Sequence, residues 1–292
     1  MSRLFIGFFI AFIVLPSLTM AQRSYEEGVN LLKNGKIQQA KSILLEHKEK
    51  EEAIDFLGDI ASFNKNWDKA IEYYRSLVDR KPDSAEYNFK LGGALGMKAL
   101  ESSKFQAALL IPEMKKSLLN AAELDPYHTE VRRALVEFYM QIPSFLGGGE
   151  NTAMEYVKEL EKINKVDAHL AKAYIYKMEE EPEAFREEIR KAIKVAEDNP
   201  ELVTRNHVYF ELGERAAVLN INPDKSSEFL ERYILNYGYK DLKSPAYAYL
   251  HLARIKAAQN NREEALKNIN LALNHKVIFP EAEKEKMRIL QM

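Results

Sequence analysis

Small and large apolar residues alternate with polar residues in a pattern that recurs along most of the chain. Three pairs of small residues share a spacing of twelve: Gly28 with Ala40, Gly58 with Ala70, and Ala253 with Ala265. The large residues that flank them are Leu57, Trp67 and Tyr74 in the clearest unit, and Leu252, Leu266 and Ile269 in the last. Two antiparallel helices can cross closely only where both carry small side chains. The spacing therefore predicts a series of antiparallel helix pairs.

Proline marks the ends of these pairs. Pro82 lies twelve residues after Ala70, and Pro126 occupies the same place in Ala-Glu-Leu-Asp-Pro. Proline cannot continue a helix but suits the start of the next one. We expect six or seven helix pairs from about Tyr25 to Lys276, followed by a capping helix from Glu281. The pairs near residues 166–199 and 200–240 are degenerate, and their boundaries stay open.

Residues 1–21 have the pattern of a secretory signal peptide. They begin Met-Ser-Arg, continue with a run from Leu4 to Leu15 that carries no charge, and end with small residues at Thr19 and Ala21. The alternative is an uncleaved membrane anchor. A spanning helix needs about 20 apolar residues, and this run is shorter and is interrupted by Pro16. The pattern predicts export to the periplasm or the exterior, and no stable membrane insertion after cleavage.

The repeated unit resembles the tetratricopeptide repeat family. The resemblance rests on Phe56, Leu57, Gly58, Asn66, Trp67, Asp68, Lys69, Ala70, Tyr73, Tyr74, Leu77 and Pro82, and on the segment from Asn260 to Leu266. It covers most of residues 22–292 and implies an all-α fold, a right-handed α-solenoid of antiparallel helix pairs that forms a superhelix. Insertions are expected near 97–112 and 141–152. The second, in which Gly147 and Gly148 follow Pro143, resembles a loop of exported bacterial members and implies no activity.

Composition agrees with helices and removes several classes of chemistry. The 292 residues include only 12 Gly and 10 Pro, below the usual ~7% and ~5%. The absence of Cys excludes disulfides, cysteine zinc sites and thiol catalysis. The formal net charge is −2, so no basic excess favours nucleic acid.

No catalytic, cofactor or metal motif stands out. The three glycines at 147–149 are followed by Glu150 and no Lys-Ser or Lys-Thr, which favours a flexible loop, with Asn151 or Thr152 capping the next helix, over a phosphate loop. The six His residues are scattered, and no nucleophile has an evident base nearby in the sequence. We expect neither an enzyme, nor a bound cofactor, nor a metal.

The first helix of each pair lines the inner face of such a superhelix. In the register that the resemblance implies, the groove candidates are Tyr25, Asp55, Asp59, Phe63, Phe89, Met97, Arg133, Glu137, Tyr247 and Arg254. Asp55 and Asp59 occupy places where the chaperone-binding members hold a peptide carboxylate, and they would repel one.

These residues predict a non-catalytic exported scaffold that binds a protein or peptide partner through its concave groove. The alternative is a small-ligand-binding component of an envelope transport or assembly system, in which both insertions close over the groove. Phe145 and Leu146 leave two possibilities open: they pack on neighbouring helices, or they project and contact a partner.

The signal-peptide pattern predicts cleavage after Ala21. N-terminal sequencing of the exported protein should begin at Gln22. Recovery of the chain from the membrane fraction with Met1 intact would contradict the prediction.

Overall fold

A computed structural model describes residue 22, residues 24–276 and residues 278–292. The predicted signal peptide lies outside these residues. Within them the chain forms helices and no strands, and it divides into two compact units. The first unit comprises residues up to Leu109 together with Gly238–Lys240, and the second comprises Leu110–Tyr237 with Asp241–Met292.

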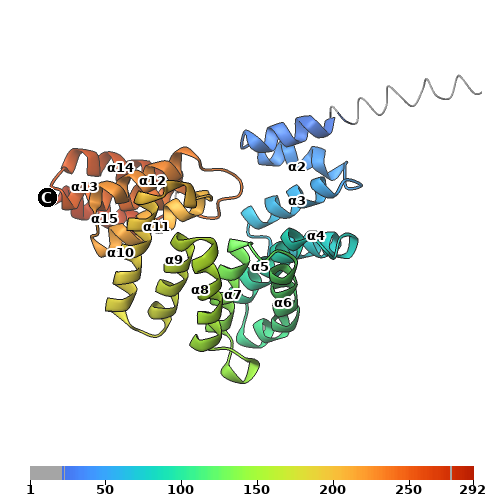
Figure 1. Cartoon of the computed structure of the whole chain (residues 1–292). Coiled ribbons are helices and arrows are strands. Elements are labelled where there is room, and N and C mark those ends of the chain that lie inside the picture. The colour runs from blue at the N-terminus through green and yellow to red at the C-terminus, as the bar shows by residue number, and fades with distance from the viewer. Residues whose placement is uncertain (1–21, 23, 277) are drawn as a thin grey trace, which may run out of the picture. The chain divides into compact units, whose positions relative to one another are not determined.

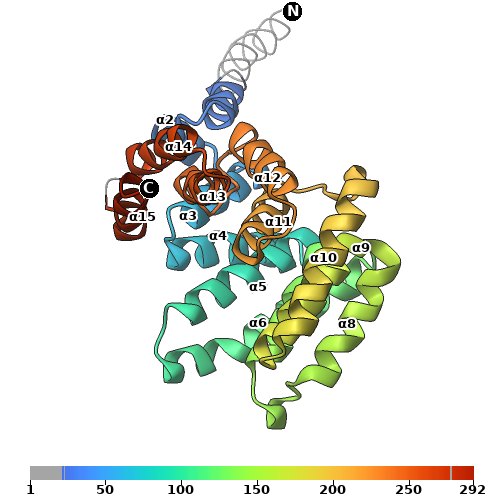
Figure 2. The ribbon, with the colours of Figure 1, turned by 90° about the vertical axis from the view of Figure 1, so that its left-hand side faces the viewer.

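Antiparallel helices connected by short turns make up both units (Figures 1 and 2). The first unit holds a helix in residues 24–33, then α2 (Ile37–Leu45), α3 (Glu51–Phe63), α4 (Trp67–Arg80) and α5 (Ala85–Leu100). The helix α6 (Lys104–Leu124) contains the boundary between the units. The second unit holds α7 (Thr129–Gln141), α8 (Glu150–Ile163), α9 (Lys165–Met178), α10 (Pro182–Asp198), α11 (Asn206–Leu219), α12 (Pro223–Leu235), α13 (Pro245–Ala258), α14 (Arg262–His275) and α15 (Pro280–Leu290).

Small residues set the distance between paired helices in the first unit. An ideal Cβ placed on Gly58 in α3 would lie 2.4 Å from the ring of Tyr74 in α4, so any larger residue would collide with it. Ala70, one turn before Tyr74, is fully buried. A Cβ on Gly28 would similarly lie 2.9 Å from Ile43. The twelve-residue spacing therefore marks real helix crossings.

The second unit contains a crossing that the spacing did not predict. A Cβ on Gly213 in α11 would lie 2.6 Å from Leu230 in α12, and the Ser226 hydroxyl donates a hydrogen bond to the Gly213 carbonyl. The small residue on the second helix is thus Ser226, which lies thirteen residues after Gly213 and not twelve. The intervening turn has positive φ at two residues, Asn220 and Asn222, whereas the turn between Gly58 and Ala70 has it at Lys65 alone.

The two expected insertions take different forms. The segment 97–112 consists of the last turn of α5, a short turn and the start of α6, so its additional residues lengthen helices. The segment 141–152 contains a 3-10 turn at Ser144–Leu146 before α8 begins at Glu150. The expectation that Asn151 or Thr152 caps this helix is wrong, because Gly149 is its N-cap and both residues lie inside the first turn.

The substitution Ala70→Leu should lower the free energy of unfolding by about 1–3 kcal/mol, because it forces a branched side chain into a fully packed crossing. Ala258→Leu, the same change at an exposed position of α13, is the matched control and should leave the denaturation midpoint nearly unchanged. Urea denaturation of both variants tests this, and equal midpoints would mean that the crossing lies elsewhere.

Candidate functional site

The predicted carboxylates of α3 surround a lysine of α5 within the first unit. Lys90 Nζ lies 2.6 Å from Asp55 Oδ1 and 2.9 Å from Asp59 Oδ1. The Tyr74 hydroxyl donates a hydrogen bond of 2.9 Å to the same Asp59 oxygen. We call these four residues the Lys90 cluster. Two carboxylates thus share one buried ammonium, and the hydroxyl of a packed tyrosine holds one of them in place.

Burial and neighbouring charge have opposite effects on the pKa of Lys90. Burial favours the neutral form of Lys90, but Asp59 and Asp55 outweigh it, so the pKa of the ammonium is raised. Burial raises the pKa of Tyr74 well above its ordinary value. Burial also raises the pKa of Tyr239, which groups with this unit, to about 12, with a further contribution from Asp59. Lys90 therefore stays charged, and the tyrosines stay neutral donors.

A second charged cluster joins three first helices of the second unit. Arg133 of α7 donates to Asp167 Oδ1 of α9 at 3.2 Å and to Glu211 Oε2 of α11 at 2.8 Å. Arg205, directly before α11, donates to the same Asp167 oxygen. We call Arg133, Asp167, Arg205 and Glu211 the Arg133 cluster. It contains two guanidinium groups and two carboxylates, so its charges balance.

Glu137 and His207 lie beside the Arg133 cluster, and their pKa values are shifted mainly by the protein around them and to a smaller degree by the charges of the cluster. Surrounding protein raises the pKa of Glu137 by displacing water, although Arg133 beside it acts in the opposite direction. Displaced water, with Arg205 and Arg133 adding repulsion, lowers the pKa of His207 to about 4. His207 is therefore neutral at physiological pH.

The remaining groove candidates lie in separate surroundings. Tyr25 packs edge-on against His47, with ring centroids 5.8 Å apart. Tyr247 packs edge-on against Phe279 at 4.9 Å, and Arg254 pairs with Glu281 at 2.8 Å. The half-buried candidates on α3 and α5 are Phe63, Phe89 and Met97.

Sequence reasoning missed four of the residues that complete the two clusters. These are Lys90, Asp167, Arg205 and Glu211. One signal was present, because Arg133 and Asp167 are 34 positions apart, the length of one repeat. Residues at that separation occupy equivalent places on successive first helices and can meet. The uncertain register of residues 166–240 concealed Arg205 and Glu211.

The loop between α7 and α8 holds two apolar residues away from the core. The side chain of Phe145 is 84% exposed and that of Leu146 is 39% exposed. Figure 1 shows this loop projecting beyond the ends of α7 and α8. The interpretation that Phe145 packs on neighbouring helices is therefore wrong.

Hydrogen bonds and special backbone angles shape this loop, for which the three glycines had suggested flexibility. Gly147 and Gly149 adopt φ of 90° and 125°, and a Cβ on Gly148 would lie 1.9 Å from the Ile142 carbonyl oxygen. Gly149 N–H donates to the Tyr139 carbonyl at 2.8 Å, and Lys115 Nζ donates to the Leu146 carbonyl at 3.2 Å. Glycine is thus required at each of the three positions.

The described residues contain neither a candidate membrane span nor a candidate metal site. No helix among them is both long enough and apolar enough to cross a membrane. No three histidine or carboxylate side chains among them lie in an arrangement that could hold a metal ion.

Known proteins resemble this chain in fold. No protein-family model and no curated protein sequence matches it. The human IFIT1 dimer with m7Gppp-AAAA is 18% identical, with a TM-score of 0.56 over 91% of this chain and 60% of that one. The APC/C hetero-tetramer Cut9-Hcn1 is 14% identical, with a TM-score of 0.51 over 90% of this chain and 48% of that one. A tetratricopeptide repeat protein from Parabacteroides merdae is 13% identical, with a TM-score of 0.48 over 92% and 98%.

Identities this low establish the fold alone. This chain has the all-α solenoid fold of tetratricopeptide-type repeats, and the predicted fold class is confirmed. The chain spans about half of the Cut9-Hcn1 chain and 60% of the IFIT1 chain.

The substitution Asp167→Asn should destabilise the second unit by about 3 kcal/mol, because it leaves Arg133 and Arg205 without their shared buried carboxylate. Asp198→Asn, which removes an exposed carboxylate paired with Lys194, is the control and should hardly move the denaturation midpoint. Equal midpoints for the two variants in urea would show that the Arg133 cluster does not hold the helices together.

Proposed function

We propose that this protein is an exported, non-catalytic helical-repeat scaffold that binds a protein or peptide partner. One observation carries the proposal: an ordered loop holds Phe145 84% exposed to solvent. Export rests on the pattern of residues 1–21.

The loop has the properties of a preorganised anchor. Glycine is required at three consecutive positions, and Lys115 ties the loop to α6, so the projecting side chains lose little freedom on binding. Burial of a large apolar side chain contributes about 1.5–3 kcal/mol. Aromatic side chains that enter a pocket of a partner supply much of the affinity of protein interfaces.

The charged clusters support a structural role for part of the predicted groove. Asp55 and Asp59 already share Lys90, and Arg133 is already paired with Asp167 and Glu211. These charges hold neighbouring helices together and are not free to attract a partner strongly. The balanced charge of the Arg133 cluster and the net charge of −2 support a protein partner over the RNA present in the IFIT1 structure.

The same loop weighs against the small-ligand alternative. In that alternative the loop closes over a ligand together with the first insertion. The tip of the loop points beyond the ends of α7 and α8 into solvent (Figure 1), and the first insertion extends α5 and α6. These placements suit an external partner better than a closed chamber.

Envelope extract passed over the immobilised 22–292 chain tests the proposal. Replacement of both Phe145 and Leu146 by Ser should reduce recovery of a specific partner about ten-fold or more, the loss expected from removing one buried anchor, while the melting temperature stays unchanged.

A matched control replaces Val218 and Leu235, which are 66% and 83% exposed on the same unit, by Ser. The control should recover the partner as the parent chain does. Equal losses in both variants would indicate general adhesion, and recovery that survives the loop variant would contradict the role of the loop.

A further inference from the structure

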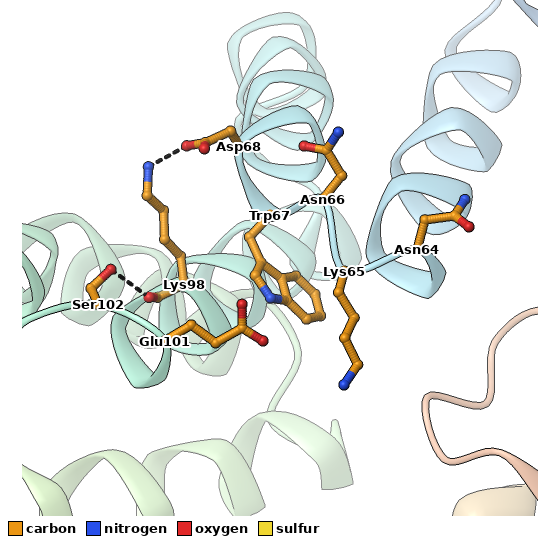
Figure 3. Close-up of a pocket in the computed structure, with 8 residues that line it drawn as sticks. All are labelled: Asn64, Lys65, Asn66, Trp67, Asp68, Lys98, Glu101 and Ser102. Atoms are coloured by element: carbon orange, nitrogen blue, oxygen red, sulfur yellow. Dashed lines mark hydrogen bonds and ion pairs between the residues drawn. The ribbon is translucent and has the colours of Figure 1, made fainter. Parts of the chain in front are cut away.

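The turns at one edge of the first unit enclose an open polar hollow of about 430 Å³ (Figure 3). The turn between α3 and α4 forms one wall, and the last turn of α5 with the residues that follow forms the other. The lining residues are Asn64, Lys65, Asn66, Trp67, Asp68, Lys98, Glu101 and Ser102. None of them belongs to the Lys90 cluster, so the hollow is a separate feature of the same unit.

One polar group of the hollow is buried without a partner, and two solvent-exposed charged side chains near it form no ion pair or hydrogen bond with the described residues. The indole of Trp67 is only 5% exposed, and its Nε1 is buried without a hydrogen-bond acceptor. The exposed Lys65 and Glu101 side chains have no ion pair or hydrogen bond. A buried donor left without an acceptor costs about 1–3 kcal/mol, so a group that supplies the acceptor would bind favourably here.

The other polar groups of the hollow are satisfied. Lys98 forms an ion pair with Asp68, and the Ser102 hydroxyl donates to the Lys98 carbonyl at 2.7 Å (Figure 3). Asn66 caps α4 by accepting from the Lys69 N–H at 3.2 Å. The formal charges of the two lysines and the two acidic residues that line the hollow add up to zero. The net charge of the lining therefore favours neither an anion nor a cation.

The arrangement of Trp67 Nε1 and the two exposed charged groups suits a ligand that carries both an acceptor and a donor. Figure 3 shows Lys65 and Glu101 on opposite sides of the indole. A ligand that satisfies all three must accept hydrogen bonds from Trp67 Nε1 and Lys65 and donate one to the Glu101 carboxylate. The main-chain amide of a peptide has this combination in one plane, with C=O as the acceptor and N–H as the donor.

We infer that the hollow binds an extended peptide segment of the partner through a main-chain amide held by Trp67, Lys65 and Glu101. The inference rests on the proposed function, since it takes the ligand to be a protein. Glu101 is exposed and can rotate to admit the segment to the indole nitrogen. Main-chain recognition makes this site tolerant of sequence, while the loop at Phe145 supplies selectivity.

The single tryptophan of the chain makes a direct test available, because the 1H–15N spectrum of residues 22–292 contains one indole resonance. The probe is the capped tripeptide acetyl-Gly-Gly-Gly-amide, with acetate and methylammonium as the anion and cation controls. The tripeptide should shift the indole resonance saturably, and neither ion should shift it at the same concentration.

Glu101→Ala should weaken the tripeptide about ten-fold, the effect of losing a hydrogen bond to a charged group. Glu123→Ala, an exposed glutamate of α6 outside the hollow, is the matched control and should leave the affinity unchanged. Thermal melting of each variant establishes that it is folded, so that a lost shift reports on binding.

Four results would overturn the inference: no shift with the tripeptide, a larger shift with acetate or with methylammonium, equal affinity in Glu101→Ala, or an upfield shift of the indole proton in unliganded Glu101→Ala. The last would mean that Glu101 itself accepts the indole hydrogen bond. If the tripeptide does not bind, the recovery of a partner through the Phe145 loop is unaffected, and only this inference fails. If the tripeptide binds but the extract yields no partner, the result counts against the proposed function and not against the hollow.

Discussion

Close contact without an intervening Cβ is the constraint on which this fold depends. At Gly58 the Tyr74 ring lies against the backbone of α3, and at Gly213 the Leu230 side chain does the same against α11. The contact at Gly58 also positions a polar group, because it brings the Tyr74 hydroxyl within 2.9 Å of Asp59 and thereby fixes one carboxylate of the Lys90 cluster. A single small residue thus sets both the distance between two helices and the place where charge can be buried.

Buried charge connects the first helices of successive pairs. The Lys90 cluster joins α3 to α5, and the Arg133 cluster joins α7, α9 and α11. Such pairs give modest net stability because desolvation offsets much of their attraction, but removal of one partner is costly. Their main effect is therefore to specify which helix faces which. The paired charges are therefore engaged within the protein, whereas the side chain of Phe145 is exposed to solvent.

Sequence reasoning predicted the fold class and the first helix crossings, but it did not predict which charged residues meet between helices. The twelve-residue spacing located the crossings at Gly28 and Gly58 because both members are small and near in the chain. The crossing at Gly213 was missed because its partner is a serine displaced by one position across a turn with positive φ. Asp55 and Asp59 were identified as candidates, but Lys90 was not, because pairing across repeats depends on a register that local patterns do not define. The exposure of Phe145 could not be read from composition, since it follows from the φ angles of the glycines beside it.

The 34-residue separation of Arg133 and Asp167 has a consequence for how this chain can change over evolutionary time. In arrays of identical repeats a unit can be duplicated or deleted, because each interface equals the next. Here the loss of the helix pair that carries Arg133 or Asp167 would leave the remaining residue buried without its partner of opposite charge. The order of the helix pairs from α7 to α11 is therefore constrained, and change there requires compensated substitutions, whereas a pair outside both clusters, such as α13 and α14, carries no such constraint.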